Sequence, residues 1–260
     1  GVREIEAYEF YRRIGLDSRL TAINKKLDKK MFYDFADINK KEKTAITKNI
    51  ERMELTYLLT PTTINIQAFI NEDYHFEGIM FVTVSLKEGT TEKDIKVLEE
   101  VIHGALPHPV VLTFSFQSKI LISTGMKRLS KVNKSTVVLE TIHRTDWIVD
   151  VRGEPVVSDF LQSIQLFNLN FSNFYEFYKD IDMAVEAFEN TNTIGTFKII
   201  KEDEQREAQQ SLIHQIHEIE QSITRLKTSI KKETQFNKKV ELNIKVQKLI
   251  KELEQIKEQL

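Results

Sequence analysis

The stretch that decides the fold is IMFVTVSLKEGTTEKDIKVLEEVIHGALPHPVVLTFSF, residues 79–116. Apolar residues alternate over Met80–Leu86, and the first positions of the opposite face are apolar as well, which predicts a central strand covered on both sides. Helical spacing follows over Ile95–Ile102, behind the N-cap candidate Thr91. A second apolar strand is predicted over Val110–Phe116. The pattern therefore indicates two strands of one sheet joined by a helical crossover.

The segments on either side of this stretch complete the fold class. Helical spacing predicts helices over Leu20–Leu27 and Ala45–Met53, and alternation over Ile64–Ile70 predicts the first strand of the sheet. Further strands are predicted around Ile120–Ile122 and Val137–Ile142. Strands that follow one another so closely usually form hairpins. We therefore expect an α+β fold, with a mixed, mostly antiparallel sheet and flanking helices.

The C-terminal part of the chain has a different composition, rich in Glu, Lys, Gln, Ile and Leu. It follows the tract Thr191–Thr196, which contains Gly195 and is the best candidate for a linker. We therefore predict two domains, a globular α+β domain over residues 1–196 and a helical arm over residues 197–260. The globular domain should stay folded without the arm.

The arm carries two heptad seams, in which large apolar residues recur at spacings of 4, 3, 4, 3 and 4 residues. The first runs from Leu212 to Ile230 and the second from Leu242 to Leu260. The step between the two seams breaks the phase, so residues 231–239 form either a stutter in one long helix or a turn between antiparallel arms. Either way, we expect the seams to pair with each other or with a second copy of the chain, because unpaired seams would leave large apolar residues in water.

The overall composition is that of a folded protein in water. Of the 260 residues, 41% are hydrophobic and 29% are charged, with 37 Lys and Arg against 39 Asp and Glu. The absence of Cys excludes disulfides, thiolate metal sites and Cys nucleophiles. The longest uncharged run, residues 160–175, contains polar residues and is too short for a membrane span. We therefore expect a cytoplasmic protein.

No motif in the sequence identifies an enzyme. The chain lacks the phosphate-binding patterns GxxxxGK[ST] and GxGxxG, the nucleophile pattern GxSxG and the zinc pattern HExxH. We predict no cofactor. A divergent metal-dependent nuclease or other hydrolase would instead have to gather acids and His of the sheet around a pocket. The candidates for that role are Glu77, Asp94, Glu140, His143 and Asp146.

Two histidines of the arm have a spacing that metal ligands use. His214 and His217 lie three residues apart, close to Glu218, on the first heptad helix. They flank the seam position Ile216, on a face that we expect to be exposed. We therefore interpret them as solvated residues and predict no metal site.

A basic segment is the strongest candidate for a nucleic-acid contact. Residues 118–135 carry five basic residues and no acidic one. Such a segment could neutralise phosphates, although no aromatic residue is interleaved for base stacking and a solvated surface is the alternative interpretation. The candidate residues are Lys127, Arg128, Lys131 and Lys134.

The segment KKETQFNKKVELN, residues 231–243, resembles the end of a bacterial family known as domain of unknown function 4391. Two other features are similar, the passage Ile102–Pro109 into a strand and Trp147 followed by the aromatic-rich helix Phe167–Tyr178. The resemblance spans most of the chain. It implies no reaction and no functional residue, but it implies a companion of helicases and DNA methyltransferases in restriction-like or anti-phage systems.

The residues that match the family lie where the heptad pattern breaks, which makes them candidates for contact with a partner. The alternative is that the aromatic residue anchors the tip of a hairpin or docks the arm, while the polar residues satisfy exposed backbone groups. These candidates are Gln235, Phe236, Asn237, Glu241 and Asn243.

Together these observations favour an interaction or adaptor protein. We expect its partner to be a protein, by family resemblance a helicase or DNA-methyltransferase component of bacterial defence, and we expect the arm to allow self-association. Nucleic acid is a weaker candidate partner, and a membrane is not one. The divergent nuclease or hydrolase remains the alternative function.

Overall fold

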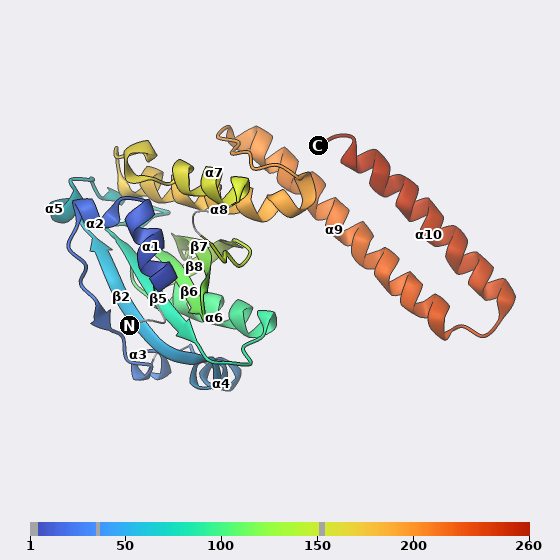
Figure 1. The fold of residues 1–260 in the computed structure, drawn as a ribbon, viewed down its shortest axis with the longest axis horizontal. Coiled ribbons are helices and arrows are strands. Elements are labelled where there is room, and N and C mark those ends of the chain that lie inside the picture. The colour runs from blue at the N-terminus through green and yellow to red at the C-terminus, as the bar shows by residue number, and fades with distance from the viewer. Residues whose placement is uncertain (1–4, 35–36, 151–153) are drawn as a thin grey trace. The chain divides into compact units, whose positions relative to one another are not determined.

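The computed structural model describes residues 5–34, 37–150 and 154–260 (Figure 1). The chain divides into two units, residues 1–191 with 196–198 and residues 192–195 with 199–260. The first unit contains the sheet and the helices around it. The second contains a pair of long helices, and each unit is described by itself.

Six strands of the described residues form the main sheet, in the order β1-β2-β5-β6-β7-β8. Neighbouring strands are antiparallel except β5 and β6, which are parallel and joined by the crossover helix α6. The predicted α+β class with a mostly antiparallel sheet is confirmed. The strands are β1 (Lys25–Lys26), β2 (Ile50–Leu59), β5 (Ile79–Leu86), β6 (Val110–Phe116), β7 (Lys119–Leu129) and β8 (Val137–Arg144), with β3 (Phe69–Ile70) and β4 (His75–Phe76) in a separate two-stranded sheet.

Helices pack around the main sheet (Figure 1). A short 3₁₀ helix, Leu166–Asn168, precedes the long helix α8. No helix of the described ranges is both long and apolar enough to cross a lipid bilayer. The α-helices of the first unit are α1 (Ile5–Arg13), α2 (Leu16–Arg19), α3 (Lys30–Tyr33), α4 (Lys40–Asn49), α5 (Pro61–Ile64), α6 (Glu92–Ala105), α7 (Pro155–Ser163) and α8 (Phe174–Ile194), of which the last three residues belong to the second unit.

The side chains on the two faces of the central strand β5 pack into two different parts of the core. Val82 and Val84 belong to a cluster that includes Ile46 of α4 and Leu98 of α6. On the opposite face Tyr11 of α1 is buried, with its Oη 2.6 Å from Thr83 Oγ1 and 3.1 Å from Thr113 Oγ1. All eight residues of β5 are buried, as expected for a strand covered on both sides.

The crossover helix α6 begins where the sequence indicated. Thr91 is the N-cap, and its Oγ1 accepts a hydrogen bond from Asp94 N at 3.2 Å, while Asp94 Oδ2 accepts one from Thr91 N at 3.0 Å. Such a reciprocal capping box satisfies two backbone donors that the helix leaves unpaired. Asp94 is therefore occupied in starting α6.

The predictions for the N-terminal third were wrong in two places. Leu20–Leu27 is not helical, because α2 ends at Arg19 and the chain then runs extended into β1. The helix predicted over Ala45–Met53 ends at Asn49, and Ile50 begins β2. The apolar residues of β2 pair with β5, and this long-range pairing overrides the helical spacing that overlaps it.

The strand predicted over Ile64–Ile70 was also wrong. Residues 61–64 form the short helix α5, and Asn65 takes a left-handed conformation with φ of 56°. Only Phe69 and Ile70 are in a strand, and they pair with β4 rather than with the main sheet. Apolar residues do alternate in this segment. However, Pro61 favours the first turn of a helix, so Ile64 belongs to α5 and not to a strand.

Only the end of the tract Thr191–Thr196 lies outside helical structure, so the linker is shorter than the sequence indicated. Helix α8 continues to Ile194, and the chain leaves helical structure at Gly195, whose φ is +91°. Glycine adopts this left-handed conformation without steric cost. Whether residues 1–196 fold alone stays a prediction.

The second unit is a hairpin of α9 (Asp203–Lys232) and α10 (Phe236–Lys257), so the turn is the correct one of the two alternatives (Figure 1). The turn needs no Gly or Pro. Glu233 Oε1 accepts hydrogen bonds from the backbone N–H groups of Thr234 and Gln235, each at 3.0 Å. These bonds place a carboxylate at the start of α10, where the helix dipole favours negative charge, and they lower the pKa of Glu233.

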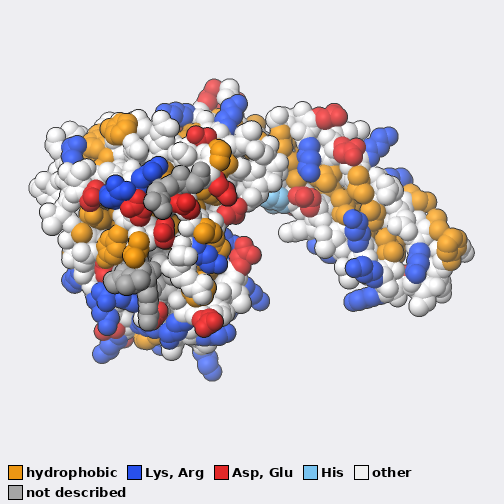
Figure 2. Space-filling model, in the orientation of Figure 1, with side chains coloured by type: hydrophobic (Ala, Val, Ile, Leu, Met, Phe, Trp, Pro, Cys, Tyr) orange, Lys and Arg blue, Asp and Glu red, His pale blue; other side chains and the backbone are white. Residues whose placement is uncertain are grey.

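Pairing of the two helices buries the predicted seams only in part. Ile216, Ile223, Val246 and Ile256 are buried, whereas the other seam residues are half-buried and Leu260 is exposed. Figure 2 shows hydrophobic side chains on the visible face of this hairpin, with Lys and Arg among them. A two-helix hairpin shields one side of each seam, which leaves apolar surface in contact with water.

Candidate functional site

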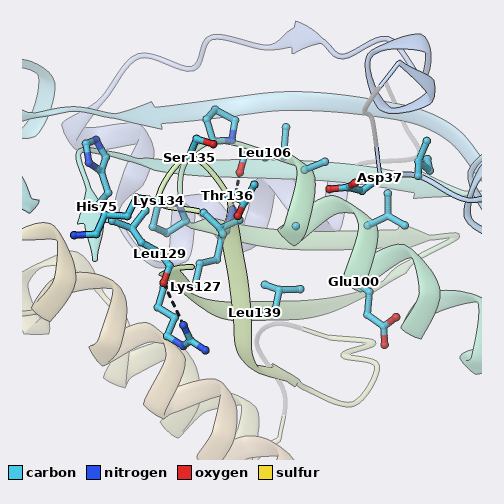
Figure 3. A pocket seen from close by; sticks show the side chains of 18 of the residues that line it. Asp37, His75, Glu100, Leu106, Lys127, Leu129, Lys134, Ser135, Thr136 and Leu139 are labelled. Carbon is cyan, nitrogen blue, oxygen red and sulfur yellow. Dashed lines mark hydrogen bonds between the residues drawn. The ribbon is translucent and has the colours of Figure 1, made fainter. Parts of the chain in front are cut away.

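A candidate site is a pocket of about 800 Å³ in the first unit, at the C-terminal end of α6. It lies between that helix, the β7–β8 hairpin and β4, so segments far apart in the sequence form its wall (Figure 3). Its apolar lining includes Leu106, Pro109, Leu129 and Leu139. This volume is in the range typical of small-molecule sites.

Lys127 of β7 lines this pocket and is nearly inaccessible, with 4% of its surface exposed. Its Nζ donates hydrogen bonds to the carbonyl oxygens of Leu106 at 2.8 Å and His108 at 2.7 Å. Both acceptors are neutral, and burial lowers the pKa of Lys127 to about 7. Lys127 pairs with no carboxylate in the described part of the chain.

Charged side chains lie at two ends of the pocket (Figure 3). His75, Lys127 and Lys134 are at one end, where His75 Nε2 also lies 3.0 Å from Glu77 Oε2. Asp37 and Glu100 are at the other end. The pocket thus has a basic end and an acidic end, separated by apolar side chains.

The four basic residues proposed for phosphate contact occupy different environments. Lys127, Arg128 and Lys134 line the pocket, whereas Lys131 does not. Arg128 Nη1 donates to the carbonyl oxygen of Leu129 at 3.2 Å. Because Lys127 is buried, it cannot contribute to an open surface that follows a nucleic-acid backbone.

The acids and His proposed for a hydrolase are not gathered around this pocket, since none of them lines it. Glu77 pairs with His75, Asp94 caps α6, and Glu140 accepts a hydrogen bond from Tyr74 Oη at 2.9 Å. Asp146 follows β8, outside this wall. The described residues contain no cluster of three or more His, Asp or Glu that could hold a metal ion.

His143 of β8 belongs to a separate cluster against α8. Its Nε2 lies 3.0 Å from Glu186 Oε2 and its Nδ1 lies 3.2 Å from Glu189 Oε1. Burial alone would lower the pKa of His143, but the hydrogen bonds to the two carboxylates outweigh it and raise the pKa to about 10. A charged His between two carboxylates joins the edge strand to the helix, which is a structural role.

A buried polar network on the other side of the sheet was missed by the sequence analysis. Ser123 Oγ donates to Glu99 Oε2 at 2.6 Å and lies 3.0 Å from His103 Nε2, while Arg144 Nη1 lies 3.1 Å from Glu99 Oε1. Burial raises the pKa of Glu99 to about 7 and lowers that of His103 to about 3. The network is closed to solvent at Ser123 and His103, so it joins α6 to β7 and β8 rather than meeting a substrate.

The histidines of the arm are exposed, as expected for a solvated face. His214 Nε2 lies 3.1 Å from Glu218 Oε1, with both side chains largely in water. His217 Nε2 lies 3.2 Å from Thr193 Oγ1.

The partner-contact candidates lie at the tip of the hairpin. Phe236 is the first residue of α10 and is 77% exposed, so it does not anchor the tip. It continues into a row at i, i+4 and i+8 with Val240, 40% exposed, and Ile244, 51% exposed. We call Phe236, Val240 and Ile244 the tip stripe. The last two were missed, although their spacing is readable in the sequence.

The tip stripe faces away from the helix pairing. Ile244 is two residues from the seam positions Leu242 and Val246, which are half-buried and buried. Since successive helix residues are about 100° apart, a two-residue offset places the stripe on the opposite side of α10. The polar candidates Gln235, Asn237, Glu241 and Asn243 are exposed beside the stripe.

Comparison with family models identifies the family of this chain. The model of the family described as Domain of unknown function (DUF4391) matches residues 19–253. Neither the curated proteins nor the solved structures gave a match.

Proposed function

The chain belongs to the DUF4391 family, and we propose that it is an interaction protein whose hairpin arm docks on a protein partner. The observation that carries this proposal is the tip stripe, three large apolar residues exposed on the outer side of α10. Apolar rows at i, i+4 and i+8 are how a helix presents itself to a partner surface. By family resemblance, the partner is a helicase or DNA-methyltransferase component of a bacterial defence system.

Charge defines the chemistry of that partner. Residues 221–248, the half of the hairpin around the turn, contain eight Lys and Arg and two Glu. A partner that covers the tip stripe must therefore carry an apolar surface edged by acidic residues. An acidic amphipathic helix fits this description, because it can lay its apolar face along the stripe while its flanks pair with the lysines.

A matched pair of variants tests the proposal. The triple variant Phe236→Ser, Val240→Ser, Ile244→Ser removes the stripe, and Phe167→Ser removes an equally exposed Phe of the first unit, 81% exposed. Partners captured from the native host with the unmodified chain are purified and titrated against both variants. We expect the triple variant to lose at least about 30-fold in affinity, the effect of a hot spot, and Phe167→Ser to lose none.

Two results would overturn docking through the tip stripe. Equal affinity of the triple variant and the unmodified chain would show that the partner contacts another surface. A dimer in light scattering that the triple variant converts to a monomer would show that the stripe pairs with a second copy of the chain instead.

The alternative function, a hydrolase using acids and His of the sheet, has no observation in its favour. Its five candidate residues have separate hydrogen-bond or ion-pair partners or lie away from the pocket. The interaction function is therefore the one we retain.

A further inference from the structure

Burial of the charged amine of Lys127 costs free energy, and the protein's own groups offset this cost only in part. A buried ammonium loses its hydration, and stable buried charges are normally paired with an opposite charge. Here the Nζ meets two carbonyl oxygens, and no carboxylate of residues 5–34, 37–150 or 154–260 pairs with it. Lys127 lines a pocket large enough for a ligand, and an anion bound there would supply the negative charge that the protein does not.

The surroundings of Lys127 are suited to an anion. Arg128 and Lys134 line the same pocket, and His75 stands at the same end as Lys134 (Figure 3). The carboxylate of Glu77 also lies close to this end, with its Oε2 3.0 Å from His75 Nε2. Basic side chains of β7 and of the β7–β8 connection and a His of β4 thus line one pocket, and such groups can neutralise a phosphate. Arg128 follows Lys127 directly in β7, so its side chain leaves the other face of the strand and is held by the carbonyl oxygen of Leu129.

The opposite end of the pocket defines the rest of the ligand. Asp37 and Glu100 provide carboxylates there (Figure 3), which accept hydrogen bonds from donors such as hydroxyl or amino groups. The apolar side chains between the two ends suit a flat or hydrophobic body. A ligand that uses the whole pocket is anionic at one end and carries hydrogen-bond donors at the other.

We propose that this pocket binds a small organic phosphate, with its phosphate group against Lys127 and Lys134 and hydrogen-bond donors of its organic part facing Asp37 and Glu100. The pocket lies wholly within the first unit, so this proposal is independent of docking through the tip stripe. Phosphate binding supplies the counter-charge that Lys127 lacks.

Lys127 also has a structural role that the test must separate from binding. Its two acceptors, the carbonyl oxygens of Leu106 and His108, lie just after α6, so the ammonium holds the chain between α6 and β6 in place. Loss of binding in a Lys127 variant alone would therefore be ambiguous. The exposed ligand-facing residue Lys134 gives a variant that leaves these bonds intact.

Calorimetric titration of the full chain with adenosine 5′-monophosphate, ribose 5-phosphate, inorganic phosphate and adenosine tests the ligand class. We expect adenosine 5′-monophosphate to bind at least about 10-fold more tightly than adenosine, because only the former brings a charge to Lys127. Ribose 5-phosphate should bind, since it keeps the phosphate and the hydroxyl donors. No heat from any phosphorylated probe at millimolar concentration would overturn the proposal.

Charge variants locate the site. Lys134→Gln should weaken binding of adenosine 5′-monophosphate about 5- to 10-fold, whereas Lys131→Gln, three residues away and outside the pocket, should change it by less than twofold. Equal effects of the two variants would show binding to the basic surface in general and would overturn the pocket site.

A spectroscopic measurement on the unmodified chain removes the dependence on variants. The ¹³Cε resonance of Lys127 in isotope-labelled protein reports the protonation of its amine. We expect the saturating phosphate probe to raise the titration midpoint of Lys127 by at least one pH unit, because a nearby anion favours the charged form. A midpoint that the probe leaves unchanged would show that the anion binds elsewhere.

Discussion

The globular unit and the hairpin arm bury their apolar residues in different ways. In the globular unit, Tyr11 near the N-terminus contacts Thr83 and Thr113, residues about 70 and 100 positions away. In the arm, burial comes from two helices that follow each other directly, and much of each seam is only half-covered. The globular unit therefore has a closed core, whereas the arm keeps apolar surface available.

This difference links each unit to a different kind of binding. A closed core can hold a buried cation such as Lys127 in a fixed position beside a pocket, because the surrounding side chains are buried and closely packed. An open seam and an exposed stripe can be covered only by another protein surface. We therefore expect small-molecule binding and partner docking to respond to separate mutations.

The largest effect is expected from emptying the core of the globular unit. Phe114→Ala on β6 removes a fully buried ring and should lower the free energy of unfolding by about 3–5 kcal/mol. Phe236→Ala removes an exposed ring of the arm and should change it by less than about 0.5 kcal/mol. Urea unfolding followed by tryptophan fluorescence measures both. Similar losses in the two variants would contradict the contrast between the units.

The next effect concerns the seam of the arm. Ile223→Asp puts a charge at a buried position between α9 and α10, and it should cost about 1.5–3 kcal/mol of the pairing energy. Thr224→Asp, at the adjacent exposed position, is the control. Circular dichroism should show loss of helix for Ile223→Asp alone, while the unfolding of the globular unit stays unchanged. If the globular unit also melts earlier, the two units are coupled.

Two glycines of the globular unit should respond in opposite directions. A Cβ at Gly125 would lie 2.9 Å from Cγ of the buried His103, so Gly125→Ala should destabilise by about 1–3 kcal/mol. A Cβ at Gly104, in the last turn of α6, meets nothing within 4 Å. Gly104→Ala should therefore stabilise the protein by about 0.4–1 kcal/mol. In thermal melts, we expect the melting temperature of Gly125→Ala to lie below that of the unmodified chain and the melting temperature of Gly104→Ala to lie above it.

The last prediction concerns the pH dependence of the ion pairs of His143. Because its folded pKa, about 10, lies above the ordinary value of 6.5, the pairs with Glu186 and Glu189 stabilise fully below about pH 6.5 and lose this contribution as pH rises through 10. Asp182 adds a further negative charge nearby. Lys127, with its lowered pKa, has the opposite dependence over the same range.

For this reason the difference between the unmodified chain and His143→Gln is the quantity to measure. That difference in unfolding free energy should shrink between pH 6.5 and 10 by no more than about 1.4 kcal/mol per pH unit. A difference that stays constant over this range would mean that His143 does not change its protonation on folding.

The candidate pocket was predictable only in part. The cluster of basic residues in 118–135 was visible in the sequence, but the burial of Lys127 and the approach of His75 and Glu100 were not. They depend on the pairing of β7 with β6 and β8 and on where α6 ends. No periodicity within one segment carries that information.

In the fold as well, the elements that depend on neighbouring residues were predicted, whereas an element that depends on a distant partner was missed. The crossover unit 79–116 was predicted correctly because its strands carry rows of alternating apolar residues and α6 has its capping box in adjacent residues. The strand β2 was missed, because Ala45–Met53 fits a helix until β5 pairs with its second half. Local spacing predicts an element only where no distant partner competes for the same residues.

The sequence by itself determined the crossover, the fold class and the two seams of the arm, because capping, alternation and heptad spacing act over a few residues. The tertiary structure decided that the arm turns back at Glu233, that β2 rather than a helix follows α4, and that Lys127 is buried beside a pocket. These outcomes depend on contacts between distant segments, whose free energy exists only after the chain has folded.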